Sequence, residues 1–416
     1  MDDFYSLYDR VVQAAATGRL NGELNKERPF NADPGSLDCL LNPDKCSPVF
    51  NTGTCGCSDE EKQKCEDVCF FDAICQDENG NMIISNKDCT GCSDCIDQCK
   101  YKNLTDRKDI IPLFQTLYKK ETPVYALIAP AFIGQFSEEV TPGKLRTAFK
   151  KLGFAGMIEV ALFADILTLK EALEFDRYIH TEDDFLLTSC CCPIWIAMIK
   201  KVYTELIPHM PPSVSPMVAC GRSVKKIQPD AITVFIGPCV AKKAEAREPD
   251  IKDATDYVLT FKEVKDLFDV AGINPALLPE DQKEHSSKAG RIYARTEGVS
   301  QAIETTLNKL KPDRKIPLKA TQGNGTVECK KLLNDLLQGK IRANFIEGMG
   351  CKGGCVGGPK AILDKEEGRD NVNGYGDSAL YETPAENPHV IDLLHRIGFD
   401  TIDSLLEKDH MFVRKF

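Results

Sequence analysis

Nineteen of the 416 residues are cysteine, and this count constrains the chain more than any other feature of its sequence. In a small secreted chain it would predict a disulfide framework. This chain is long, and its N-terminus, MDDFYSLYDR, lacks the basic-then-apolar layout of a signal peptide. We therefore expect a cytoplasmic protein with reduced thiols, and an odd number of cysteines in tight clusters also fits disulfides poorly. Metal or iron–sulfur ligation is the better prediction.

The charge balance excludes two classes of partner. The chain has 52 Lys and Arg against 63 Asp and Glu, so its formal net charge is −11. An acidic chain with a single Trp and no basic tract is a poor ligand for nucleic acid or an anionic membrane surface. No apolar run is long enough to span a bilayer. We expect no nucleic-acid partner and no membrane association.

The pattern of apolar residues changes at about residue 120. Short runs rich in Val, Ile and Phe predict buried strands within residues 123–132, 156–164, 184–189, 231–237 and 343–349. Helical patterns are expected at residues 141–153, 166–179, 193–207 and 261–272. Because strands and helices alternate, we predict an α/β domain with parallel sheets, flanking helices and an active site at the carboxyl ends of the strands.

The two ends of the chain have simpler patterns. An amphipathic helix is expected at residues 4–17, followed by an irregular connection at residues 27–38 that is rich in Pro, Asn, Gly and Asp. The last residues have helical patterns at 389–398 and 402–409. Residues from about 50 to 105 are dense in cysteine and poor in apolar periodicity, so we predict a small module held together by metal.

The run Cys89-x2-Cys92-x2-Cys95-x3-Cys99 is the most specific local signal. Three thiolates at this spacing surround one [4Fe-4S] cluster, and the fourth serves a second cluster in two-cluster ferredoxins. Structural zinc sites more often separate two CxxC pairs by a dozen or more residues. A looser run begins with Cys-x-Cys; it comprises Cys55, Cys57, Cys65 and Cys69.

The stretch CEDVCFFDAICQDENGNMIISNKDCTGCSDCIDQC resembles bacterial two-cluster ferredoxins, although Phe70 and Lys100 stand where those usually have Pro. The resemblance implies an electron relay with ligands exchanged between the two halves. One [4Fe-4S] cluster would use Cys55, Cys57, Cys65 and Cys99, and the other Cys69, Cys89, Cys92 and Cys95. The alternative leaves Cys55 or Cys57 unligated, because a C-x-C start is atypical. We expect Cys75 to be a buried core thiol, and packing roles for Cys39, Cys46, Cys220 and Cys329.

Three more segments place cysteines directly after a strand-like run. They are FLLTSCCCP, FIGPC and FIEGMGCKGGC, which contain Cys190, Cys191, Cys192, Cys239, Cys351 and Cys355. Because the carboxyl ends of parallel strands meet in one crevice, these thiols can together hold one metal group. Two alternatives are packing of the adjacent thiols as small apolar residues and a phosphate-binding glycine loop. The phosphate-loop pattern G-x4-G-K-[ST] is absent.

The motifs TSCCCP, GPCVAKKAE and EGMGCKGGCVGG resemble the three active-site signatures of [FeFe]-hydrogenases, and the triple cysteine resembles the subgroup called group B. The resemblance covers about residues 50–365, and the C-terminal helices resemble the small-subunit tail of that family. It implies an N-terminal extension at 1–50, a ferredoxin-like module at 51–110, a catalytic domain at 111–365 and the tail at 366–416. It also implies an H-cluster, a [4Fe-4S] cubane bridged to a di-iron subsite with CO, CN⁻ and azadithiolate ligands.

Site residues follow from this resemblance. Cys239, Cys351 and one cysteine of the triplet would bind the cubane, and Cys355 would bridge to the di-iron subsite. Alignment from Pro193 makes Cys192 the ligand and Cys191 the proton-relay thiol, whereas alignment from Thr188 makes them Cys191 and Cys190. We prefer the first alignment, because the helix fixes the geometry after Pro193. The remaining matches are Lys242 to a cyanide-contacting lysine, Met349 to a methionine beside the bridging ligand, and Glu171 and Glu174 to proton-channel glutamates. From spacing alone, the two glutamates are equally compatible with solvent-facing charges.

Three positions depart from the family pattern. Pro211 stands at a proton-channel position that is usually Ser, so we expect Ser213 or a water molecule to take its place. Gly237 replaces a Met that usually packs on the di-iron site, and Ala131 replaces a frequent Ser. These changes leave turnover rate and catalytic bias open.

The resemblance implies a ferredoxin-type hydrogenase that interconverts H₂ with protons and electrons. It implies a soluble redox carrier such as ferredoxin, and maturation proteins that build the di-iron unit. The alternative is a hydrogenase-like iron–sulfur scaffold or an H₂ sensor with little turnover. The triple cysteine, Lys242 and Met349 argue against the scaffold.

Overall fold

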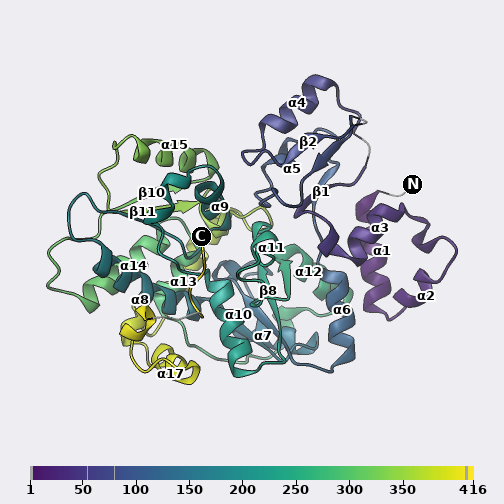
Figure 1. Cartoon of the computed structure of the whole chain (residues 1–416). Coiled ribbons are helices and arrows are strands. Elements are labelled where there is room, and N and C mark those ends of the chain that lie inside the picture. The colour runs from purple at the N-terminus through teal and green to yellow at the C-terminus, as the bar shows by residue number, and fades with distance from the viewer. Residues whose placement is uncertain (1–2, 54, 79, 408–410) are drawn as a thin grey trace.

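The computed structural model describes residues 3–53, 55–78, 80–407 and 411–416. Most of the chain forms an α/β region, and a small cysteine-rich module and the N-terminal helices lie together on one side of it (Figure 1).

Two parallel sheets form the framework of the α/β region. One has the strand order β6-β5-β8-β9, with β5 (Val124–Ile128), β6 (Gly156–Glu159), β8 (Ile232–Gly237) and β9 (Tyr257–Thr260). The other has the order β10-β11-β7, with β7 (Leu186–Leu187), β10 (Ala320–Asn324) and β11 (Phe345–Met349). The predicted α/β class with parallel sheets is therefore confirmed.

Helices connect and flank these strands. They are α6 (Ile110–Lys119), α7 (Pro142–Lys151), α8 (Ala161–Tyr178), α9 (Pro193–Lys201), α10 (Pro216–Ile227), α11 (Ala241–Glu245), α12 (Phe261–Val270), α13 (Lys288–Arg291), α14 (Gly298–Leu310), α15 (Thr326–Leu337), α16 (Lys365–Asp377) and α17 (Pro388–Ile397). Two predicted boundaries were wrong. The run at 156–164 is a strand only to Glu159 and then begins α8, because a continuous apolar run does not distinguish a strand from a buried helix. Helix α9 ends at Lys201, and a 3₁₀ turn (Thr204–His209) follows.

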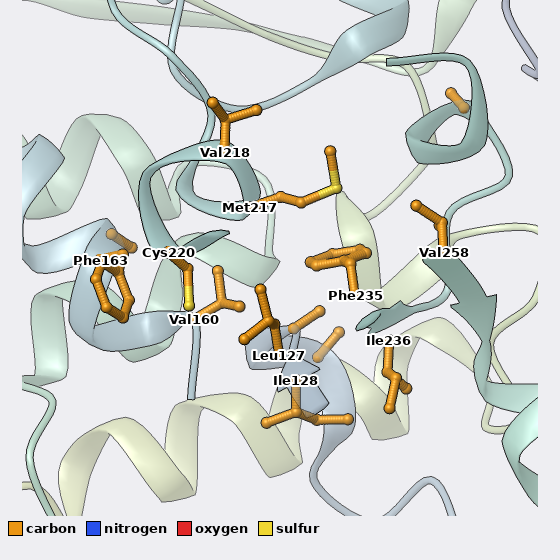
Figure 2. Packing of buried hydrophobic residues seen from close by; sticks show 14 of the residues in the cluster. Leu127, Ile128, Val160, Phe163, Met217, Val218, Cys220, Phe235, Ile236 and Val258 are labelled. Carbon is orange, nitrogen blue, oxygen red and sulfur yellow. The ribbon is translucent and has the colours of Figure 1, made fainter. Parts of the chain in front are cut away.

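The buried faces of the sheet and its helices form one apolar core. Leu127 and Ile128 of β5 and Phe235 and Ile236 of β8 point among side chains from neighbouring elements (Figure 2). Cys220 of α10 lies in this core, fully buried, which confirms the packing role expected for it.

The N-terminal residues form three helices, α1 (Phe4–Ala16), α2 (Leu20–Leu24) and α3 (Pro34–Leu41). The prediction of an irregular connection at 27–38 was wrong in its second half. Asp33 accepts a hydrogen bond from the Ser36 backbone N–H, and Pro34 stands at the first helical position, which are both helix-start signals. The packing roles predicted for Cys39 and Cys46 were also wrong, and the expectation of reduced thiols fails for this pair. A 3₁₀ turn (Pro43–Lys45) reverses the chain, and the two cysteines form a disulfide.

The cysteine-rich module has little regular structure. It contains the antiparallel pairs β1 (Val49–Asn51) with β4 (Leu104–Asp106) and β2 (Ile74–Gln76) with β3 (Met82–Ile84), and the helices α4 (Asp59–Asp67) and α5 (Asp94–Gln98). Cys75 is exposed, so the prediction of a buried core thiol was wrong. Successive side chains in a strand point to opposite faces, and in β2 it is Ile74 that points inward.

The C-terminal segment returns to the α/β region. Helix α17 confirms the pattern at 389–398, whereas the pattern at 402–409 gives a 3₁₀ turn (Asp403–Leu406) and then runs into residues outside the described part. Val413 pairs with Ser213 in an antiparallel bridge. None of the helices in the described residues has the length and apolar content that a membrane span requires.

A buried ion pair ties the module to the α/β region. The Lys243 ammonium donates to Glu263 Oε2 at 2.9 Å and to the backbone carbonyl of Arg107 at 2.5 Å, and both side chains are fully buried. Glu263 also accepts from the Asp109 backbone N–H at 2.8 Å and from the Thr260 backbone N–H at the start of α12. One pair therefore joins α11, α12 and the chain that leaves the module.

We expect Lys243→Met to lower the free energy of unfolding by about 3–5 kcal/mol, because it leaves the Glu263 carboxylate buried without its cation. Denaturant unfolding measures the loss. The matched control is Lys265→Met in α12, whose pair with Asp269 is 55% and 62% exposed, and we expect a loss below about 1 kcal/mol. Equal losses in the two variants would contradict the structural role of Lys243.

Candidate active site

Cysteines from both sheets meet at the carboxyl ends of the strands. Cys190–Cys192 follow β7, Cys351 and Cys355 follow β11 of the same sheet, and Cys239 follows β8 of the other sheet. This edge is where α/β proteins bind ligands. The placement brings together the cysteines that the sequence singled out.

Four of these thiols form a cluster. Cys192 is buried, and Cys239, Cys351 and Cys355 are partly buried. Burial raises the pKa of all four thiols, that of Cys192 to about 12, and the charges of neighbouring thiols raise the pKa values of Cys192, Cys351 and Cys355 further. Because iron binds the thiolate form, a bound cluster would reverse this effect and stabilise the four charges.

The donor set fits an iron–sulfur cluster better than a single ion. Among the described residues, no group of three or more Cys, His, Asp or Glu side chains is arranged to bind one metal ion. Thiolates are the ligands of iron–sulfur clusters, whose several iron atoms let the ligands stand farther apart than around one ion.

Close packing fixes the cysteine that precedes α9. Pro193 begins this helix, and the buried Trp195 donates its indole N–H to the Thr188 carbonyl at 3.0 Å. A Cβ at Gly348 of β11 would lie 2.0 Å from the Trp195 ring, so only glycine fits there. The Gly350 backbone N–H then donates to Cys192 Sγ at 3.2 Å. These contacts hold Cys192 against the segment that carries Cys351.

Lys242 lies beside the thiol cluster. Its ammonium donates to the Cys191 carbonyl at 3.2 Å and to Glu245 Oε2 at 2.5 Å, and the side chain is buried. Burial opposes its charge, but the Glu245 carboxylate and nearby thiols more than offset this and raise its pKa. Met349 is also buried, at the end of β11. The sequence had not singled out Glu245, although its i,i+3 spacing from Lys242 predicts contact on a helix.

The two glutamates of α8 are buried, so the solvent-facing alternative was wrong. Burial, with the nearby Glu174 charge, raises the pKa of Glu171 to about 7, and neither Glu171 oxygen has a hydrogen-bond partner of normal geometry among the described residues. The Ser213 hydroxyl donates to Glu174 Oε2 at 3.2 Å. Ser213 therefore lies within hydrogen-bond distance of Glu174.

The cysteine triplet has three different environments. Cys192 neighbours Cys239, as a cubane ligand must, whereas the fully buried Cys190 lies next to both Cys191 and Glu171. Cys191 lies near Cys355. Cys192 is thus the thiol of the triplet that lies beside Cys239 and Cys351, and Cys190 is the one beside Glu171.

Gly237 and Ala131, two positions that differ from the family pattern, are closely surrounded by other residues. A Cβ at Gly237 would lie 3.0 Å from the Phe235 ring and 3.1 Å from Ala129 Cβ, so a larger residue would displace them. Ala131 is fully buried. Cys329 is buried as expected, and its thiol points to the Gly323 carbonyl at 3.4 Å.

The module cysteines lie in two sets of neighbouring thiols. Electrostatic contacts connect Cys55, Cys57, Cys65 and Cys99 in one set, and Cys69, Cys89, Cys92 and Cys95 in the other. Gly91, between Cys89 and Cys92, has a φ of 74°, and a Cβ there would lie 3.0 Å from Ala241 Cα. The second set thus lies directly against α11, two residues beyond Cys239.

Comparison with known proteins identifies the α/β region. The chain is 31% identical over 269 residues to the periplasmic [Fe] hydrogenase large subunit of Nitratidesulfovibrio vulgaris, covering 54% of this chain and 63% of that protein. It is 25% identical over 337 residues to cytosolic iron-sulfur assembly component 3 of Pongo abelii, covering 66% of this chain and 71% of that protein. The chain spans between about half and two thirds of the length of the hydrogenases it matches.

The fold agrees with these matches. A variant of the [FeFe]-hydrogenase HydA1 from Chlamydomonas reinhardtii superposes with a TM-score of 0.59 at 22% identity, covering 73% of this chain and 98% of that chain. Residues 122–359, more than half of the chain, match the family described as "Iron only hydrogenase large subunit, C-terminal domain". The chain therefore belongs to the iron-only hydrogenase large-subunit family.

Proposed function

We propose that this protein is a ferredoxin-type [FeFe]-hydrogenase that catalyses 2H⁺ + 2e⁻ ⇌ H₂. The observation that carries the proposal is the convergence of Cys192, Cys239, Cys351 and Cys355 beside the buried Lys242, with the Glu171 carboxyl on the far side of the triplet.

The residues present fit an H-cluster. Cys192, Cys239 and Cys351 would hold its cubane, and Cys355 would bridge to the di-iron subsite with its CO, CN⁻ and azadithiolate ligands. When bound, the group supplies the redox chemistry at which H₂ is formed and split. The buried Lys242 ammonium would donate a hydrogen bond to an anionic ligand of the cluster. The buried Met349 side chain would exclude water from the site.

Proton movement would use residues on α8 and the triplet. Cys191 lies near Cys355 of the thiol cluster, and Cys190 contacts both Cys191 and Glu171. A proton would therefore pass between the cluster and Glu171 through these two thiols. A carboxyl with a pKa of about 7 gains and loses protons readily at neutral pH, as a relay must. Glu174 and Ser213 would continue the path.

Electrons would pass through two [4Fe-4S] clusters in residues 51–110. The contact of Gly91 with α11 supports this route, because it places the loop between Cys89 and Cys92 close to the helix that follows Cys239. We further propose an N-terminal extension (1–50), a catalytic domain (111–365) and a small-subunit-like tail (366–416). The TSCCCP motif supports membership of group B.

The proposal includes ferredoxin or a similar soluble carrier as electron partner, and maturation proteins that supply the di-iron unit. A cytoplasmic location belongs to the same proposal, because free thiols and iron–sulfur ligands are best kept in a reducing compartment.

A second candidate function is an iron–sulfur scaffold without a di-iron unit. The similarity to cytosolic iron-sulfur assembly component 3 favours it. Such a protein needs thiols for clusters, but it has no need of Lys242 or of a carboxyl relay, and this chain has both beside the thiols. A sensor of H₂ with little turnover would share the site and differ in rate.

Loading the reconstituted protein with a di-iron precursor under anaerobic conditions is expected to give infrared bands of metal-bound CO and CN⁻ that shift under H₂. Cys355→Ser should lose these bands, because it removes the thiolate that bridges to the di-iron subsite. The control Cys75→Ser changes an exposed thiol outside both cluster sets and should keep them. Iron–sulfur absorption without CO and CN⁻ bands in the unmodified protein would instead favour the scaffold.

Glu171→Gln should lower turnover by about 10²-fold or more, because the amide cannot carry a proton. The variant should also be more stable than the unmodified protein at pH 8. A carboxyl whose pKa rises from about 4.5 to about 7 on folding destabilises the folded state above its unfolded pKa, by up to about 3 kcal/mol once pH exceeds 7. Thermal unfolding at pH 5 and pH 8 tests this, and an advantage that does not grow with pH would contradict it.

Cys92→Ser should remove about four iron atoms per chain and one electron paramagnetic resonance signal of the reduced protein, because it takes a ligand from the second set. H₂-dependent dye reduction through the module should fall, whereas the CO and CN⁻ bands should remain. An unchanged iron content would show that Cys92 is not a ligand.

A further inference from the structure

A buried lysine stands beside the proposed proton path, one residue before Glu171. Lys170 of α8 is 2% exposed, Glu174 is 3% exposed and Ser213 is fully buried. The Lys170 ammonium donates to Glu174 Oε1 and, at 2.8 Å, to Ser213 Oγ. Ser213 Oγ donates in turn to Glu174 Oε2 at 3.2 Å. The three side chains form a closed ring of hydrogen bonds.

We propose that Lys170 is a positioning residue of the proton path, whose ammonium closes this ring and controls when Glu174 can carry a proton. The inference rests on the proposed function, because a controlled carboxyl matters only if protons pass through it. Lys170 does not touch the thiol cluster, and neither the family motifs nor the comparisons assign it a role.

The direction of the control follows from the hydrogen bonds. Burial raises the pKa of Glu174, and the ring opposes that rise. Both Glu174 oxygens accept hydrogen bonds, and one donor carries a full charge that favours the ionised carboxylate. A proton reaches Glu174 only when at least one of these bonds opens. Without Lys170 the buried carboxyl would lose its counter-charge and keep its proton to higher pH.

Other charged groups do not replace the Lys170 ammonium. On α8 itself, the Arg177 charge favours ionisation of Glu174, and the Glu174 charge in turn raises the pKa of Glu171. The Arg177 guanidinium donates to the Leu406 carbonyl. The cations of neighbouring segments are paired elsewhere: Arg222 with Asp253, Arg291 with Glu284, and Arg414 with Glu248 and Asp250.

The ring also accounts for Pro211. A proline has no hydroxyl to pass a proton, and Ser213, two residues later, supplies the oxygen instead. The Ser213 backbone N–H donates to the Pro211 carbonyl at 2.8 Å, and its strand-like pairing with Val413 holds the segment in place. The hydroxyl therefore reaches Glu174 from a fixed backbone.

Infrared titration of the full-length reconstituted protein tests the inference. The C=O stretch of protonated Glu174 is assigned by its loss in Glu174→Gln. In Lys170→Met its midpoint should rise by about one to three pH units, and in Lys170→Arg, which keeps the charge, it should stay nearer that of the unmodified protein. In the loaded protein, the alkaline limit of proton reduction should move upward in Lys170→Met by a similar amount.

An unchanged Glu174 midpoint in Lys170→Met would overturn the inference, and so would a shift of equal size in Lys170→Arg. Lys170→Gln removes the charge but keeps a hydrogen-bond donor, so the measurement does not depend on one variant folding. The titration is also made before the di-iron precursor is added. A protein that shows the Glu174 shift but never gains CO and CN⁻ bands would refute the proposed function and leave the ring intact.

Discussion

The desolvation of neighbouring thiols at the carboxyl ends of two parallel sheets is the constraint on which the rest of the structure depends. Burial and the charges of neighbouring thiols raise the pKa values of Cys192, Cys351 and Cys355. A cluster that needs thiolates would reverse this penalty, so its binding energy would also hold the two sheets together. The close contact of Trp195 with Gly348 sets the position of Cys192 before any metal arrives.

The buried charges near this site serve different purposes. Lys243 and Glu263 form hydrogen bonds with the backbone of Arg107 and Asp109, where the chain leaves the module. Their ion pair therefore fixes the position of the module against the α/β region. Lys242 has a carboxylate on one side and the thiol cluster on the other, which leaves it available to an anionic ligand. Lys170 closes a ring with Glu174 and Ser213 away from the thiols. Local partners, rather than charge alone, distinguish these three lysines.

A close backbone approach adds to the lysine side chains that join the module to the α/β region. Gly91 adopts a left-handed conformation and lies against Ala241, where a side chain would not fit. This brings the loop between Cys89 and Cys92 to the helix that follows Cys239. Electron transfer weakens steeply with distance, so a backbone contact at this point suits a relay between the two sites.

The sequence by itself determined the α/β class and most strands, because strand periodicity is a local property. The grouping of the cysteines is a prediction from their spacing and from the family resemblance. The sequence did not determine the pairing of Cys39 with Cys46, which depends on the turn between them. It also did not determine the exposure of Cys75 or the burial of Glu171, because these depend on which face of a strand or helix packs against the rest of the protein. Only the tertiary structure separated the environments of Cys190, Cys191 and Cys192 and brought Lys170 to Ser213, which lies 43 residues away along the chain. Those contacts arise where distant segments pack, and no local pattern encodes them.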